Sequence, residues 1–226
     1  MCFSPEASFS LAGVLAVGGS YCLHRADRVD RSYLPMAAIP IVFAVQQFCE
    51  GWVWIGLERG DPGLTKLAAL SYLFFAVCFW PVWIPYSMLL VEQSRRTRFF
   101  LRAATSTGIV LGLGLTLPVI VDPSWLAVDV SHHSLHYNIG RSPIFQMFPD
   151  VLWEAIYLVV VSTPLFASSV QKMVHAGVAV IVSAAATHVF FDHAFASVWC
   201  FFAAGLSIYL CVFFASLRPG LRPARS

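Results

Sequence analysis

The uncharged stretch Leu67–Leu90, with the sequence LAALSYLFFAVCFWPVWIPYSMLL, decides the class of the protein. It is longer than the ~20 residues that an α-helix needs to cross the hydrocarbon core of a membrane. Similar apolar runs recur from one end of the chain to the other. We therefore predict an all-α, polytopic membrane protein with seven transmembrane helices, at residues 7–23, 34–57, 67–91, 99–121, 151–169, 173–191 and 194–216.

The composition agrees with this prediction. Of the 226 residues, 58% are hydrophobic and only 12% are charged, whereas ~25% of the residues of a soluble domain are charged. The seven helices leave no room for a separate soluble domain. We expect one membrane domain over residues 1–217, followed by a basic cytoplasmic tail at 218–226.

The basic residues predict the orientation of the helices. With seven crossings, eleven of the fourteen Lys and Arg residues fall on one side, and only Arg59, Lys66 and Arg141 fall on the other. Because positive charge collects on the cytoplasmic side of membrane proteins, we predict an outer N-terminus and a cytoplasmic C-terminus. The residues before the first helix include no Lys or Arg, which favours a membrane anchor over a cleaved signal peptide. We expect a multi-pass protein of the inner (plasma) membrane.

Residues 122–150 are the longest predicted connection, and they lie on the outer side. This segment is too polar for a helix in lipid and too long for a plain connector, and such segments usually have a function. It combines histidines with the apolar run Ile144–Phe148. Two arrangements remain open: the apolar run lies in the membrane interface, or the segment folds over the bundle as a lid.

Glu50 is the most conspicuous polar residue within a predicted helix. Gln46 lies four residues before it and so shares its helical face, and Gly51 permits close packing of a neighbouring element. Ionisable groups within membrane helices are costly and indicate a functional site by default. Two interpretations remain open: a structural hydrogen bond between Glu50 and glutamine, or a role as metal ligand, proton acceptor or general base.

The outer end of the sixth predicted helix contains a possible metal-binding set. His188 and Asp192 are four residues apart and share a helical face, and His193 follows directly. Two such side chains can chelate a transition metal. His132 and His136 would repeat this spacing if their segment is helical. We expect His188, Asp192, His193 and Glu50 to be the metal ligands, unless the histidines simply lie in the headgroup region.

Cys2 is a further candidate for chemistry. Removal of Met1 would leave an N-terminal cysteine outside the membrane, and its thiol and amine could bind a metal or act as nucleophile and base. Cys200, near the start of the seventh helix, is a possible disulfide or co-ligand partner. The predicted catalytic residues are therefore Glu50, Asp192 and Cys2.

Other functions are disfavoured by the residues that are missing from the sequence. The seventh helix has no lysine for a retinal Schiff base, and the chain has no glycine-rich phosphate loop that would bind a nucleotide. No basic patch with interleaved aromatic residues indicates binding of nucleic acid.

Three blocks of sequence resemble an uncharacterised family of bacterial membrane proteins, a domain of unknown function. They are Met1-Cys2-Phe3-Ser4 with Ala7-Ser8-Phe9, Gln46-Gln47 to Glu50-Gly51, and Ser197–Ala204. The resemblance covers nearly the whole chain and implies no activity. It draws attention to Cys2, Glu50 and Cys200.

A looser similarity links the chain to the seven-helix zinc hydrolases that include alkaline ceramidases and adiponectin receptors. Those proteins bind zinc through three histidines, and His188, Asp192 and His193 are similar to part of such a set. Gln47 and Glu50 stand in the second helix, where this chain has no histidine. The similarity implies a divalent metal such as zinc.

We therefore expect a polar, metal-binding site near the outer face, and a metal-dependent hydrolase that acts on a lipid-like substrate. One alternative is a small-molecule transporter or channel, with prolines that kink helices around a path. Another is an accessory subunit that forms a homo- or hetero-oligomer through its transmembrane helices. Membrane lipid is a partner in each case.

Overall fold

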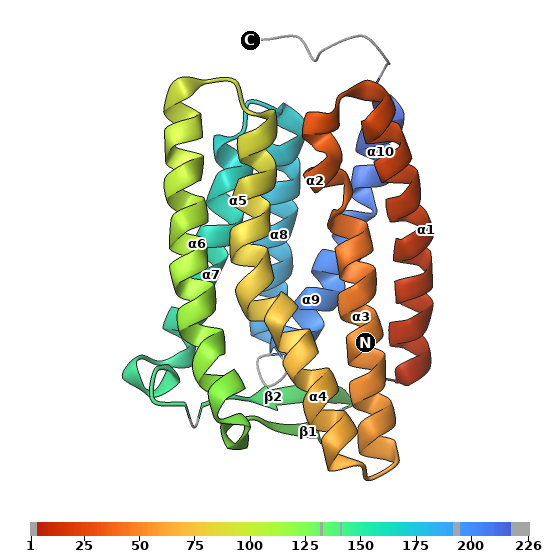
Figure 1. The fold of residues 1–226 in the computed structure, drawn as a ribbon, viewed down its shortest axis with the longest axis vertical. Coiled ribbons are helices and arrows are strands. Elements are labelled where there is room, and N and C mark those ends of the chain that lie inside the picture. Colours follow the sequence, from red (N-terminus) through yellow and green to blue (C-terminus); the bar gives the residue numbers. More distant parts are fainter. Residues whose placement is uncertain (1–3, 132, 141, 192–194, 218–226) are drawn as a thin grey trace.

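The computed structural model describes residues 4–131, 133–140, 142–191 and 195–217. Within these residues, seven helical segments are long and apolar enough to cross a membrane, as predicted (Figure 1). Four of them are α1 (Pro5–Val29), α6 (Arg95–Val121), α7 (Asp150–Ala167) and α8 (Gln171–Phe191). The second crossing consists of α2 (Leu34–Ala37) and α3 (Ile39–Glu58), and the seventh of α9 (Phe195–Ser207) and α10 (Tyr209–Ser216).

The third crossing is interrupted in its middle. It consists of α4 (Pro62–Leu73), a π-helical turn at Phe74–Phe79 and α5 (Trp80–Val91), and Figure 1 shows it changing direction between α4 and α5. Pro81 explains the wider turn, because it has no N–H to donate and its ring displaces the carbonyl one turn earlier. Such π-helical turns are frequent at functional sites.

The segment 122–150 contains a small β-hairpin that lies across one end of the bundle (Figure 1). Strands β1 (Ala127–Ser131) and β2 (Ser134–Asn138) pair antiparallel, with Asp129 opposite His136. The helical spacing of His132 and His136 was conditional on a helix, and that condition is not met, because His136 lies in a strand; His132 is outside the described residues. The lid remains a prediction.

The two ends of the bundle differ and are named here by their contents. The hairpin end includes β1, β2 and the turn between α3 and α4, and the basic end includes the connections that follow α1, α5 and α7 (Figure 1). Arginines such as Arg25, Arg95 and Arg98 lie at the basic end. Which end faces the cytoplasm remains a prediction from the charges.

Small residues let the helices pack closely. A Cβ atom on Gly19 of α1 would come within 2.7 Å of the backbone nitrogen of Ile41 in α3, and one on Gly108 of α6 would meet the carbonyl of Pro81. Close backbone approach of this kind is typical of transmembrane helices. Large apolar side chains such as Val17, Val110 and Phe190 are more than 70% exposed on the outside of the bundle, as lipid-facing residues are.

Candidate functional site: two cavities along the bundle

A cavity of about 290 Å³ lies beneath the hairpin. We call it the hairpin-end cavity. Its walls come from the third crossing, α6, β2, α7 and α9, and from the segment that joins β2 to α7. The polar side chains in its lining are His136, Asn138, Asp150 and Glu154, and the aromatic ones are Tyr137, Phe145, Trp153, Tyr157, Phe195 and Trp199.

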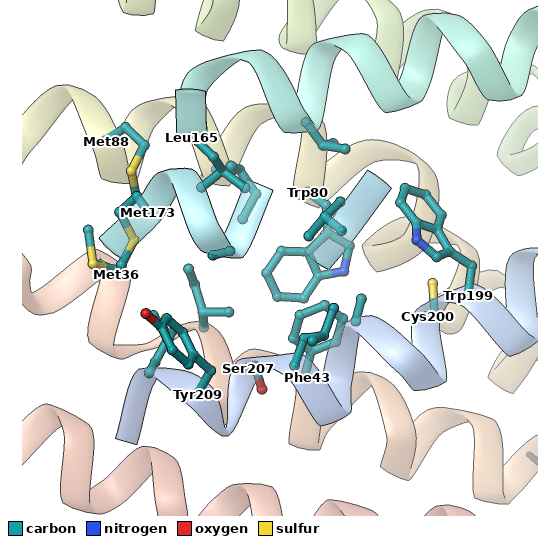
Figure 2. A pocket seen from close by; sticks show the side chains of 18 of the residues that line it. Met36, Phe43, Trp80, Met88, Leu165, Met173, Trp199, Cys200, Ser207 and Tyr209 are labelled. Carbon is teal, nitrogen blue, oxygen red and sulfur yellow. The ribbon is translucent and has the colours of Figure 1, made fainter. Parts of the chain in front are cut away.

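A second cavity, of about 110 Å³, lies deeper among α3, α5, α7, α8, α9 and α10. We call it the inner cavity. Figure 2 shows Met36, Met88 and Met173 gathered at one end of it, and Trp199 with Cys200 at the other. The lining is almost entirely apolar, with Ser207 and the tyrosine and tryptophan side chains as its polar exceptions. The inner cavity is therefore a site for apolar groups.

Tyr157, Trp199 and Cys200 line both cavities, and we call these three residues the partition. The Tyr157 hydroxyl donates a 2.6 Å hydrogen bond to the carbonyl of Ala76, within the π-helical turn. The Trp199 indole N–H donates to Ser183 Oγ over 3.2 Å, and the rings of Tyr157 and Trp199 meet edge to face at 5.4 Å. Hydrogen bonds to α8 and to the third crossing thus fix the partition in place.

Behind the partition lies a buried polar cluster on α3. Gln46 and Glu50 are fully buried. The Ser197 hydroxyl of α9 donates to Glu50 Oε1 over 2.6 Å, and the Trp80 indole N–H donates to Gln46 Oε1 over 2.6 Å. The Cys200 thiol lies within reach of both Gln46 and Tyr72. The cluster therefore joins α3 to the residue that borders both cavities.

Gln47, also fully buried on α3, differs from its neighbours. Within the described residues, neither the nitrogen nor the oxygen of its side-chain amide has a hydrogen-bond partner, and the same is true of Ser8 Oγ on α1 and of Trp54 Nε1. Buried polar groups are normally paired.

Gly51, four residues after Gln47, makes room for a side chain of α1. A Cβ on Gly51 would collide with the ring of Phe9, so the glycine accommodates that ring and not a neighbouring backbone.

Two histidine–carboxylate pairs lie at the hairpin end. His188 Nδ1 lies 3.1 Å from Glu154 Oε2, and His136 Nδ1 lies 2.9 Å from Asp129 Oδ1. A carboxylate beside Nδ1 favours the tautomer that has its proton there, which leaves Nε2 able to accept a proton or bind a metal. His188 is 45% exposed and Glu154 is 23% exposed, so both are accessible.

The structure separates two of the predicted site residues. Glu50 bonds to Ser197 inside the bundle, whereas His188 bonds to Glu154 near the end of α8. Cys2, Asp192 and His193 lie outside the described residues. Within the described part of the chain, no group of three or more His, Cys, Asp or Glu side chains lies close enough to hold a metal. Cys200 forms no disulfide with any described residue. The complete ligand set therefore stays a prediction.

Comparison with known proteins identifies the family. DUF6629, described as a family of unknown function, matches residues 1–225. The chain belongs to this family. No curated protein and no solved structure matches the chain significantly. The resemblance to an uncharacterised family is thus confirmed. Because the DUF6629 family has no known function, a function for this chain is inferred from its cavities.

Sequence reasoning missed several residues that line or support the site in this member of DUF6629. Tyr157 and Trp153 lie in the apolar segment that becomes α7, and Asp129 lies in the connection that becomes β1. A phenol in the middle of a membrane helix is a detectable signal, because its hydroxyl needs a partner there. Asp129 offered no such signal, because its pairing with His136 depends on strand register.

Proposed function

We propose that the protein binds a lipid-like amphiphile along the axis of the bundle. Its polar end would occupy the hairpin-end cavity and its apolar chain the inner cavity. One observation carries this proposal: a cavity with four polar or charged side chains in its lining and an almost entirely apolar cavity share Tyr157, Trp199 and Cys200. A molecule that follows both cavities must itself be polar at one end and apolar at the other.

The size and lining of the inner cavity support an alkyl chain over an ion. An ion path needs carbonyls, charged rings or water along its length, and this lining is almost entirely apolar. An apolar cavity of ~150 Å³ is large enough to bind benzene, so about 110 Å³ has room for several methylene groups. Met36, Met88 and Met173 have flexible side chains that adapt to chains of different shape.

The charges of the two ends predict from which side of the membrane the amphiphile enters. The basic end would face the cytoplasm of the cell, and the hairpin end would face outwards from the plasma membrane. The amphiphile would then come from the outer leaflet, or from outside the cell, and pass beneath the hairpin.

Hydrolysis by metal-activated water is the reaction that we propose for this amphiphile. His188 supports it, because a metal-ligating histidine typically donates its other N–H to a carboxylate, as Nδ1 can donate here to Glu154. Asp192 and His193 follow in the sequence and would complete the ligand set. Asp192 would take the proton from water, because Glu50 lies inside the bundle, apart from His188.

The test combines metal analysis with a binding assay on the full chain in dodecyl maltoside. We expect stoichiometric zinc or another divalent metal, and loss of both the metal and hydrolysis in His188→Ala with amphiphile binding retained. His24→Ala is the matched control, because His24 is exposed on α1 at the basic end. A metal-free protein that still binds the amphiphile would reject hydrolysis and leave binding in place.

Transfer of the amphiphile between leaflets is a second candidate function. It is favoured by the arrangement of the cavities, because movement of the partition would join them into one path along the bundle. Fluorescently labelled lipid in proteoliposomes tests it directly. Movement across the bilayer that depends on the protein would support transfer, whereas hydrolysis without movement would reject it.

A further inference from the structure

The hairpin-end cavity has a charge character that identifies the polar end of its ligand. The carboxylates of Asp150 and Glu154 belong to its lining, and the described lining residues include no lysine or arginine. In the absence of a bound metal, a phosphate or sulfate group would meet two carboxylates without a lysine or arginine in the described lining to balance them. A strongly anionic headgroup therefore fits this cavity poorly.

Aromatic rings surround the same space. Trp153 packs edge to face against Phe145, with ring centroids 5.9 Å apart, and Phe195 packs against Trp199 at 5.4 Å. All four residues line the cavity, together with Tyr157 of the partition. The faces of such rings attract cations, and aromatic cages with nearby carboxylates bind quaternary ammonium groups.

Glu154 is the carboxylate best placed to fix a cation. It lies on α7 next to Trp153, and its side chain is 23% exposed, with a hydrogen bond to His188 that holds it in position. Asp150 lies one helical turn earlier on the same helix and is more exposed. An aromatic ring and a partly buried carboxylate thus adjoin on one helix, at the boundary between cavity and solvent.

We infer that the amphiphile has a positively charged ammonium group at its polar end, held by Glu154 and the surrounding aromatic rings. This inference rests on the proposed function, since it names the class of ligand that the two cavities accept. An alkylamine or alkyltrimethylammonium is the simplest molecule of this class. Its ammonium would lie in the hairpin-end cavity and its chain would pass the partition.

Brominated probes test the inference on the full chain in micelles of dodecyl maltoside, which is uncharged. Three probes with the same chain are compared: 12-bromododecyl trimethylammonium, 12-bromododecanol and 12-bromododecyl phosphate. Bromine at the chain end quenches the fluorescence of Trp80 and Trp199 when the chain enters the inner cavity, which both residues line. We expect saturable quenching in which the ammonium probe binds about 10-fold more tightly than the alcohol and the phosphate.

Two variants locate the ammonium. Glu154→Gln and Trp153→Leu are each expected to weaken binding of the ammonium probe about 10-fold and binding of the alcohol less than about 2-fold. Their matched controls are Glu58→Gln and Trp52→Leu, since both residues are exposed and neither lines a cavity. The controls should bind all probes as the unaltered protein does, and thermal unfolding verifies that each variant is folded.

The possible outcomes distinguish a failure of the ammonium inference from a failure of the proposed amphiphile binding. Equal binding of ammonium and alcohol probes, or tightest binding of the phosphate, would overturn the ammonium inference and leave an amphiphile site in place. Absence of saturable quenching by all three probes would overturn both. Weaker binding in Glu58→Gln as well as in Glu154→Gln would show a general effect of surface charge, and the assignment of Glu154 would fall.

Discussion

Charged side chains serve different purposes at the two ends of the bundle. At the hairpin end, Asp150 and Glu154 line a cavity that is large enough for a ligand. At the basic end, the buried carboxylate of Glu92 is occupied by the protein itself. It accepts backbone hydrogen bonds from Gln93 and Ser94 over 2.8 Å, and from Ser169 over 2.9 Å.

Two arginines at the basic end also bond to the protein itself. Arg98 donates to the carbonyls of Leu89 and Glu92, where α5 ends. Arg25 of α1 donates to the carbonyls of Phe214 and Leu217, where α10 ends. Basic side chains near a helix C-terminus satisfy the last carbonyls and interact favourably with the helix dipole. These charges at the basic end are therefore satisfied within the protein, whereas at the hairpin end two carboxylates line a cavity.

Filling the inner cavity should have the largest effect on binding. Ala203 lines this cavity, and Ala203→Phe would occupy space that the chain of the amphiphile needs. Exclusion of about three methylene groups, at ~0.8 kcal/mol each, would raise the Kd of the brominated alcohol roughly 50-fold. Tryptophan quenching measures this change.

The matched control for Ala203→Phe is Ala103→Phe, at an exposed position of α6 outside both cavities. It should leave the Kd within about 2-fold of the unaltered value. Unchanged binding in Ala203→Phe would show that the chain lies elsewhere. The contrast between a basic end whose charges bond to the protein itself and a ligand-binding interior would then fail.

Glu92→Gln should affect stability instead of binding. The carboxylate of Glu92 accepts hydrogen bonds from three backbone N–H groups through its two oxygens. An amide has only one acceptor oxygen, so at least one buried N–H loses its partner. The free energy of unfolding should fall by about 2 kcal/mol. Thermal unfolding in dodecyl maltoside measures the loss, with the exposed Glu58→Gln as control. A loss of amphiphile binding in folded Glu92→Gln would contradict the division between the two ends.

The lowered pKa of the Glu92 carboxylate predicts that the stability of the protein depends on pH. Burial raises the pKa of Glu92, but the hydrogen bonds from Ser94, Ser169 and Gln93 outweigh burial, and the pKa is lowered overall. A lowered pKa in the folded state stabilises the protein above the ordinary carboxyl value of about 4.3, and this contribution is lost as the pH falls through the folded pKa. The difference in thermal stability between the unaltered protein and Glu92→Gln should therefore shrink below about pH 4.

The seven crossings could be predicted because the thickness of the bilayer imposes a minimum length on each apolar run. The helix predicted at residues 173–191, for example, is Gln171–Phe191 in the structure. The hairpin could not be predicted in this way. Short paired strands are marginal alone, and these depend on contacts from distant segments: Leu135 is fully buried, and the ring of Tyr137 stacks on Tyr72 of α4 at 4.7 Å.

The candidate site shows the same division. Glu50 was identified from sequence because a carboxylate in an apolar helix is conspicuous by itself. The cavities were not, because each is enclosed by several helices that are far apart in the sequence. Trp199 was visible only as part of a family resemblance. Its position between two cavities depends on how α9 packs against α7 and α8, which no local pattern encodes.

Tyr157→Phe should produce the smallest effect, at the boundary between the two cavities. The substitution keeps the ring of the partition and removes only the hydrogen bond to the carbonyl of Ala76. The free energy of unfolding should fall by about 1 kcal/mol. Because this bond holds the ring in place, its loss should also lower the barrier to passage of the chain by a similar amount, and quenching should proceed roughly 5-fold faster.

Stopped-flow quenching with the brominated alcohol measures that rate, and Tyr21→Phe, at an exposed position of α1, is the control. The Kd in Tyr157→Phe should change less than about 3-fold, since the ring and the linings of both cavities are kept. A rate equal to that of the unaltered protein would show that Tyr157 is no barrier to the chain. The two cavities would then act as one continuous site, and their difference in polarity alone would orient the amphiphile.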